Sequence, residues 1–376
     1  VDKIAKMVPE GPKASLEGTM KEVPEFKQAY SSDPAIRRMI DLATKLEGIA
    51  RHASVHAAGV VITPRPMTEY VPVQYDTQSE MILTQYEITD LEDLGLVKMD
   101  FLGLSNLSTI QRTTEILKFT KKKNIDMKKI PLDDKATYGL FSRGDTLGLF
   151  QVESAGMRKN LKQLHPETIF DIAAMLALYR PGPMEHIPNY IENKNNPQKI
   201  RLIDKRMAPI LSKSHGVITY QDDVLLIAIE LGGYNWETAD KFRKAMGKKI
   251  PELMAQQRDK FITGAVENGV AKNDAIKLFD LMEPFAGYGF NKAHAAAYSL
   301  VSYQTGYLKA HHPTEFMAAL LTSDLGNTDR VVLEVNECEK MGITVLPPSV
   351  NESLKIFTVV TTENETLETS KTIRFG

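Results

Sequence analysis

A lysine and an aspartate two positions apart are the residues whose types and spacing first point to chemistry. They are Lys98 and Asp100, within a short apolar stretch bounded by glycines at residues 95–103. This stretch predicts a buried strand, and because alternate residues of a strand share a face, both charged side chains would lie on one side. A carboxylate beside an ammonium group suits a site that handles phosphate and a divalent metal ion. The alternative is a strand whose second face is simply solvated, and the stretch alone favours neither.

The composition sets the broad class of protein. The chain has 376 residues, 43% of them hydrophobic and 25% charged, which is ordinary for a globular protein with two or three domains. Its single cysteine, Cys338, excludes an intramolecular disulfide framework and a Cys2His2-type zinc site. The sequence contains no long apolar run and no signal-peptide pattern, so we expect no membrane contact and a cytoplasmic location. Because the chain begins with valine, we expect it to be a fragment.

The elements that must position Lys98 and Asp100 change in character along the chain. Residues 34–51 have the apolar spacing of an amphipathic helix, opened by Asp33 and a proline. From His56 the pattern becomes that of short strands, and residues 106–325 are mainly helical. A lone histidine such as His56 is more often structural than catalytic. The predicted fold class is therefore α+β, with a small mixed or antiparallel sheet and a large, mainly helical domain.

A basic cluster stands out in the helical part. Five of nine consecutive residues are basic, although the net charge of the chain is −2; they are Lys241, Arg243, Lys244, Lys248 and Lys249. Such a cluster suits polyphosphate or a nucleic-acid backbone, where charge neutralisation supplies affinity. The alternative is a lysine-rich surface helix.

A glycine-aromatic segment follows at residues 285–294. It predicts a tight turn before a long helix that Asn291 would cap, with Lys292 and His294 in the first turn. Free backbone N–H groups, a lysine and flat rings are the parts of a nucleotide pocket. Such turns are common, so the signal gains weight only from the basic cluster upstream. Arg180 ends a nearly all-apolar helix, where an arginine usually bonds the last carbonyls.

Several short sequence motifs match those of one protein family in both order and spacing. They are residues 46–48, 56–61, 95–104, 150–154, 180–183, 243–249 and 285–294. Over roughly residues 1–350 the chain resembles the alpha subunits of bacterial DNA polymerase III, the C-family replicative DNA polymerases. The resemblance implies three parts: the end of the thumb over residues 1–55, the second part of the palm over 56–105, and most of the fingers over 106–376.

The resemblance also implies roles for individual residues. Asp100 matches the third of three palm aspartates that hold two Mg²⁺ ions, and Lys98 matches a catalytic lysine that contacts phosphate. Arg243 and Lys244 match the fingers pair on the incoming dNTP, although the family often has two arginines there and lysine lacks their bidentate fork. The remaining nucleotide-binding candidates are Arg180, Tyr288, Asn291, Lys292 and His294, and the DNA-binding candidates are Lys248 and Lys249.

The first two metal-binding aspartates of that family lie in an Asp-x-Asp motif. In this sequence no aspartate is followed by another two positions on. We therefore expect a fragment of a template-directed DNA polymerase that is inactive alone. In the full-length protein, the partners would be primer-template DNA, dNTPs, the sliding clamp and other holoenzyme subunits. The alternatives are a non-catalytic dNTP- or DNA-binding module and an unrelated metal-dependent phosphoesterase, which would need more clustered ligands around Asp100 than the sequence offers.

Overall fold

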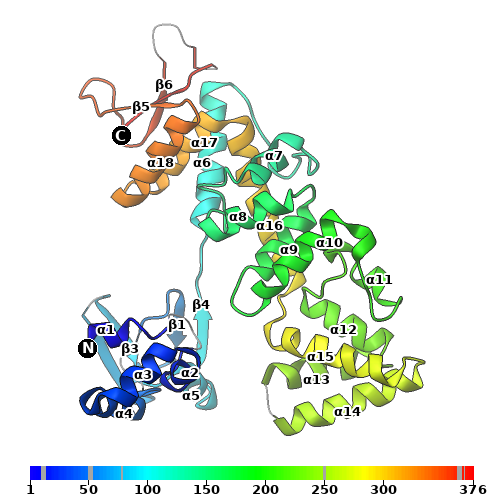
Figure 1. Ribbon diagram of the computed structural model, residues 1–376. Coiled ribbons are helices and arrows are strands. Elements are labelled where there is room, and N and C mark those ends of the chain that lie inside the picture. The colour runs from blue at the N-terminus through cyan, green and yellow to red at the C-terminus, as the bar shows by residue number, and fades with distance from the viewer. Residues whose placement is uncertain (10–13, 50–53, 78, 249–250, 362–365, 368) are drawn as a thin grey trace. The chain divides into compact units, whose positions relative to one another are not determined.

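The computed structural model describes residues 1–9, 14–49, 54–77, 79–248, 251–361, 366–367 and 369–376. The chain divides into two compact units, Val1–Gly103 and Leu104–Gly376, both visible in Figure 1. Short antiparallel strands and many helices confirm the predicted α+β class. In the described part of the chain, no helix has the length and apolar character needed to cross a bilayer.

The first unit combines short helices with two antiparallel strand pairs, β1 with β4 and β2 with β3. The predicted amphipathic helix is confirmed as α4, although it ends at Leu46, before the predicted apolar residue Ile49. Asp33 accepts hydrogen bonds from the first backbone N–H groups. The elements are α1 (Asp2–Ala5), α2 (Leu16–Glu22), α3 (Pro24–Ser32), α4 (Pro34–Leu46), β1 (Gly59–Ile62), η1 (Met67–Glu69), β2 (Val73–Asp76), β3 (Met81–Thr84), α5 (Ile88–Asp93) and β4 (Val97–Asp100).

The strand β4 exists as predicted, but the prediction that it is buried is wrong. Its apolar residues Val97 and Met99 are 57% and 45% exposed, and their cross-strand partners Ile62 and Val60 are each 50% exposed. β1 and β4 form a two-stranded ribbon, and such a ribbon buries a face only where another layer packs against it. An apolar sequence therefore predicted the strand but not its burial.

The second unit is helical, with a three-stranded sheet near its end in which β7 lies parallel to β5 and antiparallel to β6. Its elements are α6 (Ser105–Thr120), α7 (Lys135–Arg143), α8 (Ala155–Leu164), α9 (Ile169–Leu178), η2 (Pro183–His186), α10 (Ile187–Asn195), η3 (Pro197–Lys199), α11 (Met207–Ile210), η4 (Ser212–Ser214), α12 (Gln221–Glu230), α13 (Trp236–Lys248), α14 (Pro251–Glu267), α15 (Lys272–Tyr288), α16 (Lys292–His311), α17 (Pro313–Ser323), α18 (Thr328–Lys340), β5 (Thr344–Leu346), β6 (Thr358–Val360) and β7 (Thr372–Arg374). The long α16 packs against α9, α7 and α17, and α12 to α15 enclose a second apolar core (Figure 1).

The loop between α7 and α8, residues 144–154, is held by a buried lysine of α16. The Lys309 ammonium donates to the carbonyls of Asp145 and Leu147, both at 2.9 Å, and to a Glu337 carboxylate oxygen at 2.7 Å. Lys309 is only 2% exposed, so these three acceptors replace the water that its charge has lost.

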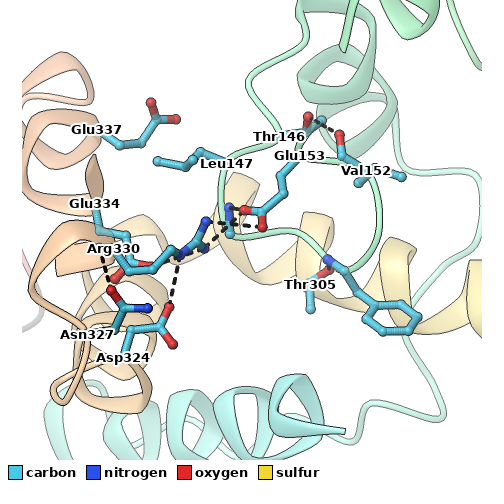
Figure 2. A network of polar contacts seen from close by, with 12 residues as sticks. Thr146, Leu147, Val152, Glu153, Thr305, Asp324, Asn327, Arg330, Glu334 and Glu337 are labelled. Carbon is cyan, nitrogen blue, oxygen red and sulfur yellow. Dashed lines mark hydrogen bonds and ion pairs between the residues drawn. The ribbon is translucent and has the colours of Figure 1, made fainter. Parts of the chain in front are cut away.

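The motif at residues 150–154 has a structural explanation in the same loop. Ser302 donates to the Phe150 carbonyl at 2.8 Å, and Thr305 accepts from the Phe150 N–H at 3.3 Å. Both Glu153 oxygens accept from the Arg330 guanidinium at 3.1 Å, as Figure 2 shows. Bidentate Arg–carboxylate pairs are directional, so this contact fixes the loop against α18.

The same arginine lies beside a buried glutamate. Arg330 also binds Asp324, and its guanidinium is 3.3 Å from a Glu334 oxygen (Figure 2). Burial, and then the neighbouring Asp324, raise the pKa of Glu334 to about 9. Glu334 is fully buried and therefore carries a proton at neutral pH.

Because the buried Glu334 carboxyl is protonated, we expect the free energy of unfolding to depend on pH. Because the pKa of Glu334 lies above its ordinary value of 4.5 in the folded state, that state holds a proton which the unfolded chain releases. The free energy of unfolding should fall as pH rises from 4.5 toward 9, by up to about 1.4 kcal/mol per pH unit. Glu334→Gln has no such proton and should lose less stability between about pH 5.5 and 8.

Urea unfolding at a series of pH values measures this difference. Glu339→Gln, an exposed change on the same helix, is the matched control and should follow the wild type. Parallel curves for the wild type and Glu334→Gln would contradict the assignment.

Candidate functional site

Lys98 and Asp100 form an ion pair on one face of the β1–β4 ribbon. The Lys98 ammonium is 2.7 Å from Asp100 Oδ1, and the period of the strand brings the two side chains together. The hydrogen bond from Lys98 is the main reason that the pKa of Asp100 lies below its ordinary value. Asp100 is half exposed, so the site presents an ionised carboxylate to solvent.

Gly59, opposite Asp100 on β1, leaves room for this pair. A Cβ at this position would lie 2.5 Å from Lys98 Cε and 2.9 Å from His56 Nδ1. His56 Nδ1 accepts the backbone N–H of Gly59 at 2.7 Å and that of Ala58 at 3.2 Å, and it lies 3.8 Å from Asp100 Oδ1. The structure thus adds His56 to the site. The signal in the sequence was the run of small residues directly after it.

The site does not contain a complete metal-binding set. Within the described ranges, no group of three or more His, Cys, Asp or Glu side chains could hold a metal ion. Asp100 supplies one hard oxygen donor of the kind that Mg²⁺ accepts. The described residues therefore offer one ligand rather than a magnesium site.

The basic cluster lies on α13, and its described cations are paired with acids of the same helix. Asp240 accepts from Arg243 Nη2 at 2.8 Å and lies 2.7 Å from Lys244 Nζ, while Lys241 binds Glu237 at 2.6 Å. Hydrogen bonds from Lys244 and Arg243 hold the pKa of Asp240 below its ordinary value. Part of the predicted positive field is therefore neutralised. Lys248 ends α13, but its side chain is not described, and Lys249 lies outside the described residues.

Arg180 and His294 meet around one aromatic ring. The Arg180 guanidinium lies 4.7 Å from the centroid of the Phe290 ring, and the His294 ring lies 5.1 Å from it. Arg180 also donates from Nε to the Ala177 carbonyl, the structural role expected of an arginine at a helix end. The ring of His294 continues to Tyr298 at 3.8 Å. Arg180, just after α9, and residues at the start of α16 thus share one basic and aromatic group, although they are more than a hundred positions apart.

The turn before α16 is shorter than predicted. Helix α15 continues to Tyr288, so the predicted turn over residues 285–288 is wrong, and the chain turns only at 289–291. Asn291 accepts the His294 N–H at 2.8 Å and caps α16 as predicted. The side chain of Tyr288 is not described.

Lys292 is positioned by the start of α12. Its ammonium lies 5.4 Å from the centroid of the Tyr220 ring, and its backbone N–H donates to Asp222 at 3.3 Å. A β-bridge between Tyr220 and Phe290 joins the two segments. The structure therefore brings Arg180, Asn291, Lys292 and His294 together, whereas Arg243 and Lys244 bind Asp240 on α13.

An ionised acid beside a lysine lies in the first unit, and a basic and aromatic group lies in the second unit. Comparisons with known protein families give the class of protein. Residues 1–103 match the model "Bacterial DNA polymerase III alpha NTPase domain", and residues 106–269 match "Bacterial DNA polymerase III alpha subunit finger domain". The chain is 45% identical over 366 residues to DNA polymerase III subunit alpha of Thermus aquaticus and 44% identical over 370 residues to that of Escherichia coli K12.

The chain belongs to the family of bacterial DNA polymerase III alpha subunits. This confirms the resemblance that the sequence motifs indicated. The two alignments cover 96% of this chain but only 30% and 32% of the relatives, so the chain spans about a third of their length.

The close packing at Gly59 predicts the effect of a single methyl group. Gly59→Ala should displace Lys98 and weaken its hydrogen bond, so the pKa of Asp100 should rise toward its ordinary value. A ¹³C NMR titration of the Asp100 carboxyl carbon measures this shift. Lys98→Met should raise the same pKa at least as much.

Gly103→Ala is the matched control, because a Cβ there would have no atom within 4 Å. It should leave the Asp100 titration unchanged. The described geometry is wrong if Gly59→Ala and Gly103→Ala give the same titration curve.

Proposed function

We propose that this chain is part of a template-directed DNA polymerase that transfers a nucleotide from a dNTP to a primer 3′-hydroxyl. The observation that carries the proposal is the Lys98–Asp100 pair over Gly59, in a chain of this family. Residues 1–55 would belong to the thumb, 56–105 to the palm and 106–376 to the fingers. The proposed location is the cytoplasm.

In this proposal Asp100 is one carboxylate ligand of Mg²⁺, and the remaining ligands come from outside this chain. Mg²⁺ would neutralise charge that develops on the phosphate oxygens. Lys98 holds the Asp100 carboxylate by its 2.7 Å contact and keeps it ionised. Its ammonium also supplies positive charge at the place where a phosphate approaches. No aspartate in the chain has a second aspartate two positions on, so we propose that the chain alone does not catalyse transfer.

The proposed dNTP contacts fall into two groups of the second unit. Arg243 and Lys244 would bind the triphosphate after exchanging Asp240 for phosphate oxygens. The other proposed nucleotide contacts are Arg180, Tyr288, Asn291, Lys292 and His294, and the proposed contacts with primer-template DNA are Lys248 and Lys249. The sliding clamp and other holoenzyme subunits would bind the full-length protein.

The second candidate is a non-catalytic module that binds dNTP or DNA. The finding that favours it is the lack of a three-ligand metal group among the residues that the structure describes. The two candidates differ in whether Asp100 matters for catalysis once the rest of the polymerase is supplied.

A chimera tests catalysis. This chain should replace the aligned segment of the Escherichia coli alpha subunit, to which it is 44% identical, and the chimera should extend a primer with Mg²⁺ and dNTPs. Asp100→Asn should lower kcat by about 10³-fold or more, because a lost metal ligand removes several kcal/mol of transition-state stabilisation. The isolated chain should give no extension under the same conditions.

Asp93→Asn, an exposed acid of α5, is the matched control in the chimera and should retain activity. Equal kcat for the Asp100→Asn and Asp93→Asn chimeras would count against the catalytic role. Extension by a clean preparation of the isolated chain would show that it needs no further carboxylates.

Titration of a fluorescent dNTP into the isolated chain tests the proposed triphosphate contact. Arg243→Ala should weaken binding about tenfold, since a charge-assisted hydrogen bond contributes about 1.5–3 kcal/mol. The matched control, Lys241→Ala on the same helix, removes a cation that binds Glu237 and should change affinity little. Equal affinities of the two variants would place the triphosphate elsewhere.

A further inference from the structure

A second run of positive charge in the described surface of the second unit lies away from α13. Residues 118–129, which we call the lysine segment, run from the last turn of α6 into the loop before α7. They contain one acid, Asp126, and six lysines: Lys118, Lys121, Lys122, Lys123, Lys128 and Lys129. The chain as a whole has a net charge of −2, so this positive charge is local.

Four of these six lysines form no ion pair with a carboxylate among the described residues. Lys121 binds Glu315 at 2.9 Å, and Lys129 lies 3.8 Å from Asp126. Among the residues that the structure describes, no carboxylate forms an ion pair with the other four lysines, all of which are exposed; they are Lys118, Lys122, Lys123 and Lys128. On α13, in contrast, Lys241, Arg243 and Lys244 each bind an acid.

A buried histidine beneath the lysine segment responds to its charge. Lys123 Nζ lies 3.4 Å from His312 Nε2. Burial first, and then the positive charges of Lys123, Lys121 and His311, lower the pKa of His312 to about 4. His312 is therefore neutral at physiological pH, so the lysines, and not His312, supply the positive charge at this surface.

An exposed aromatic ring lies within the same segment. Phe119 is 66% exposed, and the Lys122 ammonium lies 5.6 Å from the centroid of its ring. Lys122 has a positive φ of 51°, and its side chain lies over the Phe119 ring at the end of α6. A flat, exposed ring beside ammonium groups that have no carboxylate partner in the described part of the chain offers what single-stranded nucleic acid needs: a surface for base stacking and cations for phosphates.

We propose that the lysine segment binds single-stranded DNA, with Phe119 stacking on a base and Lys118, Lys122 and Lys123 neutralising neighbouring phosphates. This inference rests on the proposed polymerase function, because a templated polymerase must hold an unpaired strand. A duplex presents the same phosphates but no free base face, so Phe119 makes the segment selective for a single strand.

Fluorescence anisotropy with labelled dT20 and a 20-base-pair duplex tests the proposal on the 376-residue chain. The triple variant Lys118→Gln, Lys122→Gln, Lys123→Gln should bind dT20 about tenfold more weakly. The slope of log K against log salt should fall by about 2, since each lost phosphate contact contributes about 0.7 for a single strand. Phe119→Ala should weaken dT20 binding about fivefold or more and leave duplex binding unchanged.

The matched control removes two exposed lysines elsewhere, Lys205→Gln and Lys272→Gln, and should retain wild-type affinity for dT20. Wild-type affinity and salt slope in the triple variant would overturn the proposal, as would a wild-type chain that does not bind dT20. An unchanged dT20 affinity in Phe119→Ala would overturn the assignment to a single strand. None of these outcomes changes the expected results for the Asp100→Asn chimera or the Arg243→Ala titration. The single-strand proposal can therefore be wrong while the proposed polymerase function holds, and the reverse.

Discussion

The buried ammonium of Lys309 is the interaction on which the second unit most depends. Its three acceptors lie on two other segments, the loop at residues 144–154 and α18. Without Lys309, this loop and α18 would lose their common partner. Without the acceptors, the buried ammonium would be uncompensated, and breaking a buried ion pair in this way typically costs about 3–5 kcal/mol. Because α16 carries Lys309 near its end and Lys292 at its start, one rigid helix joins the loop to the basic and aromatic group around Phe290.

The candidate site of the first unit depends on backbone geometry rather than on burial. The period of β4 places Lys98 and Asp100 on one face, and antiparallel pairing with β1 puts Gly59 opposite Asp100. The space left by the missing side chain of Gly59 is filled by Lys98 and His56. The ion pair is exposed, so its own contribution to stability is small. Its value lies in keeping an ionised carboxylate and an ammonium group at a fixed separation.

Features that depend on local spacing were predictable from the sequence. They include the Asp33 and Asn291 caps and the shared face of Lys98 and Asp100. Burial of β4 was not predictable, because it depends on which layer packs against a two-stranded ribbon. The role of His56 was missed since it lies before β1, whereas its partner Asp100 lies at the end of β4, far along the chain. The pairing of Asp240 with Arg243 and Lys244, at i,i+3 and i,i+4, was readable from spacing, but a count of positive charges conceals it.

Pairing also determines what kind of anion each basic region of the second unit can select. On α13 a ligand must replace the Asp240 carboxylate, which already satisfies Arg243 and Lys244. A single carboxylate or monophosphate merely exchanges one anion for another, whereas a triphosphate offers more oxygens and more charge than Asp240 supplies. Exposed lysines such as Lys122 and Lys123, which form no ion pair with a carboxylate among the described residues, impose no such exchange, and their attraction falls steeply with added salt. Under the two proposals, the same residue types thus favour a compact polyphosphate on α13 and an extended phosphate backbone along residues 118–129.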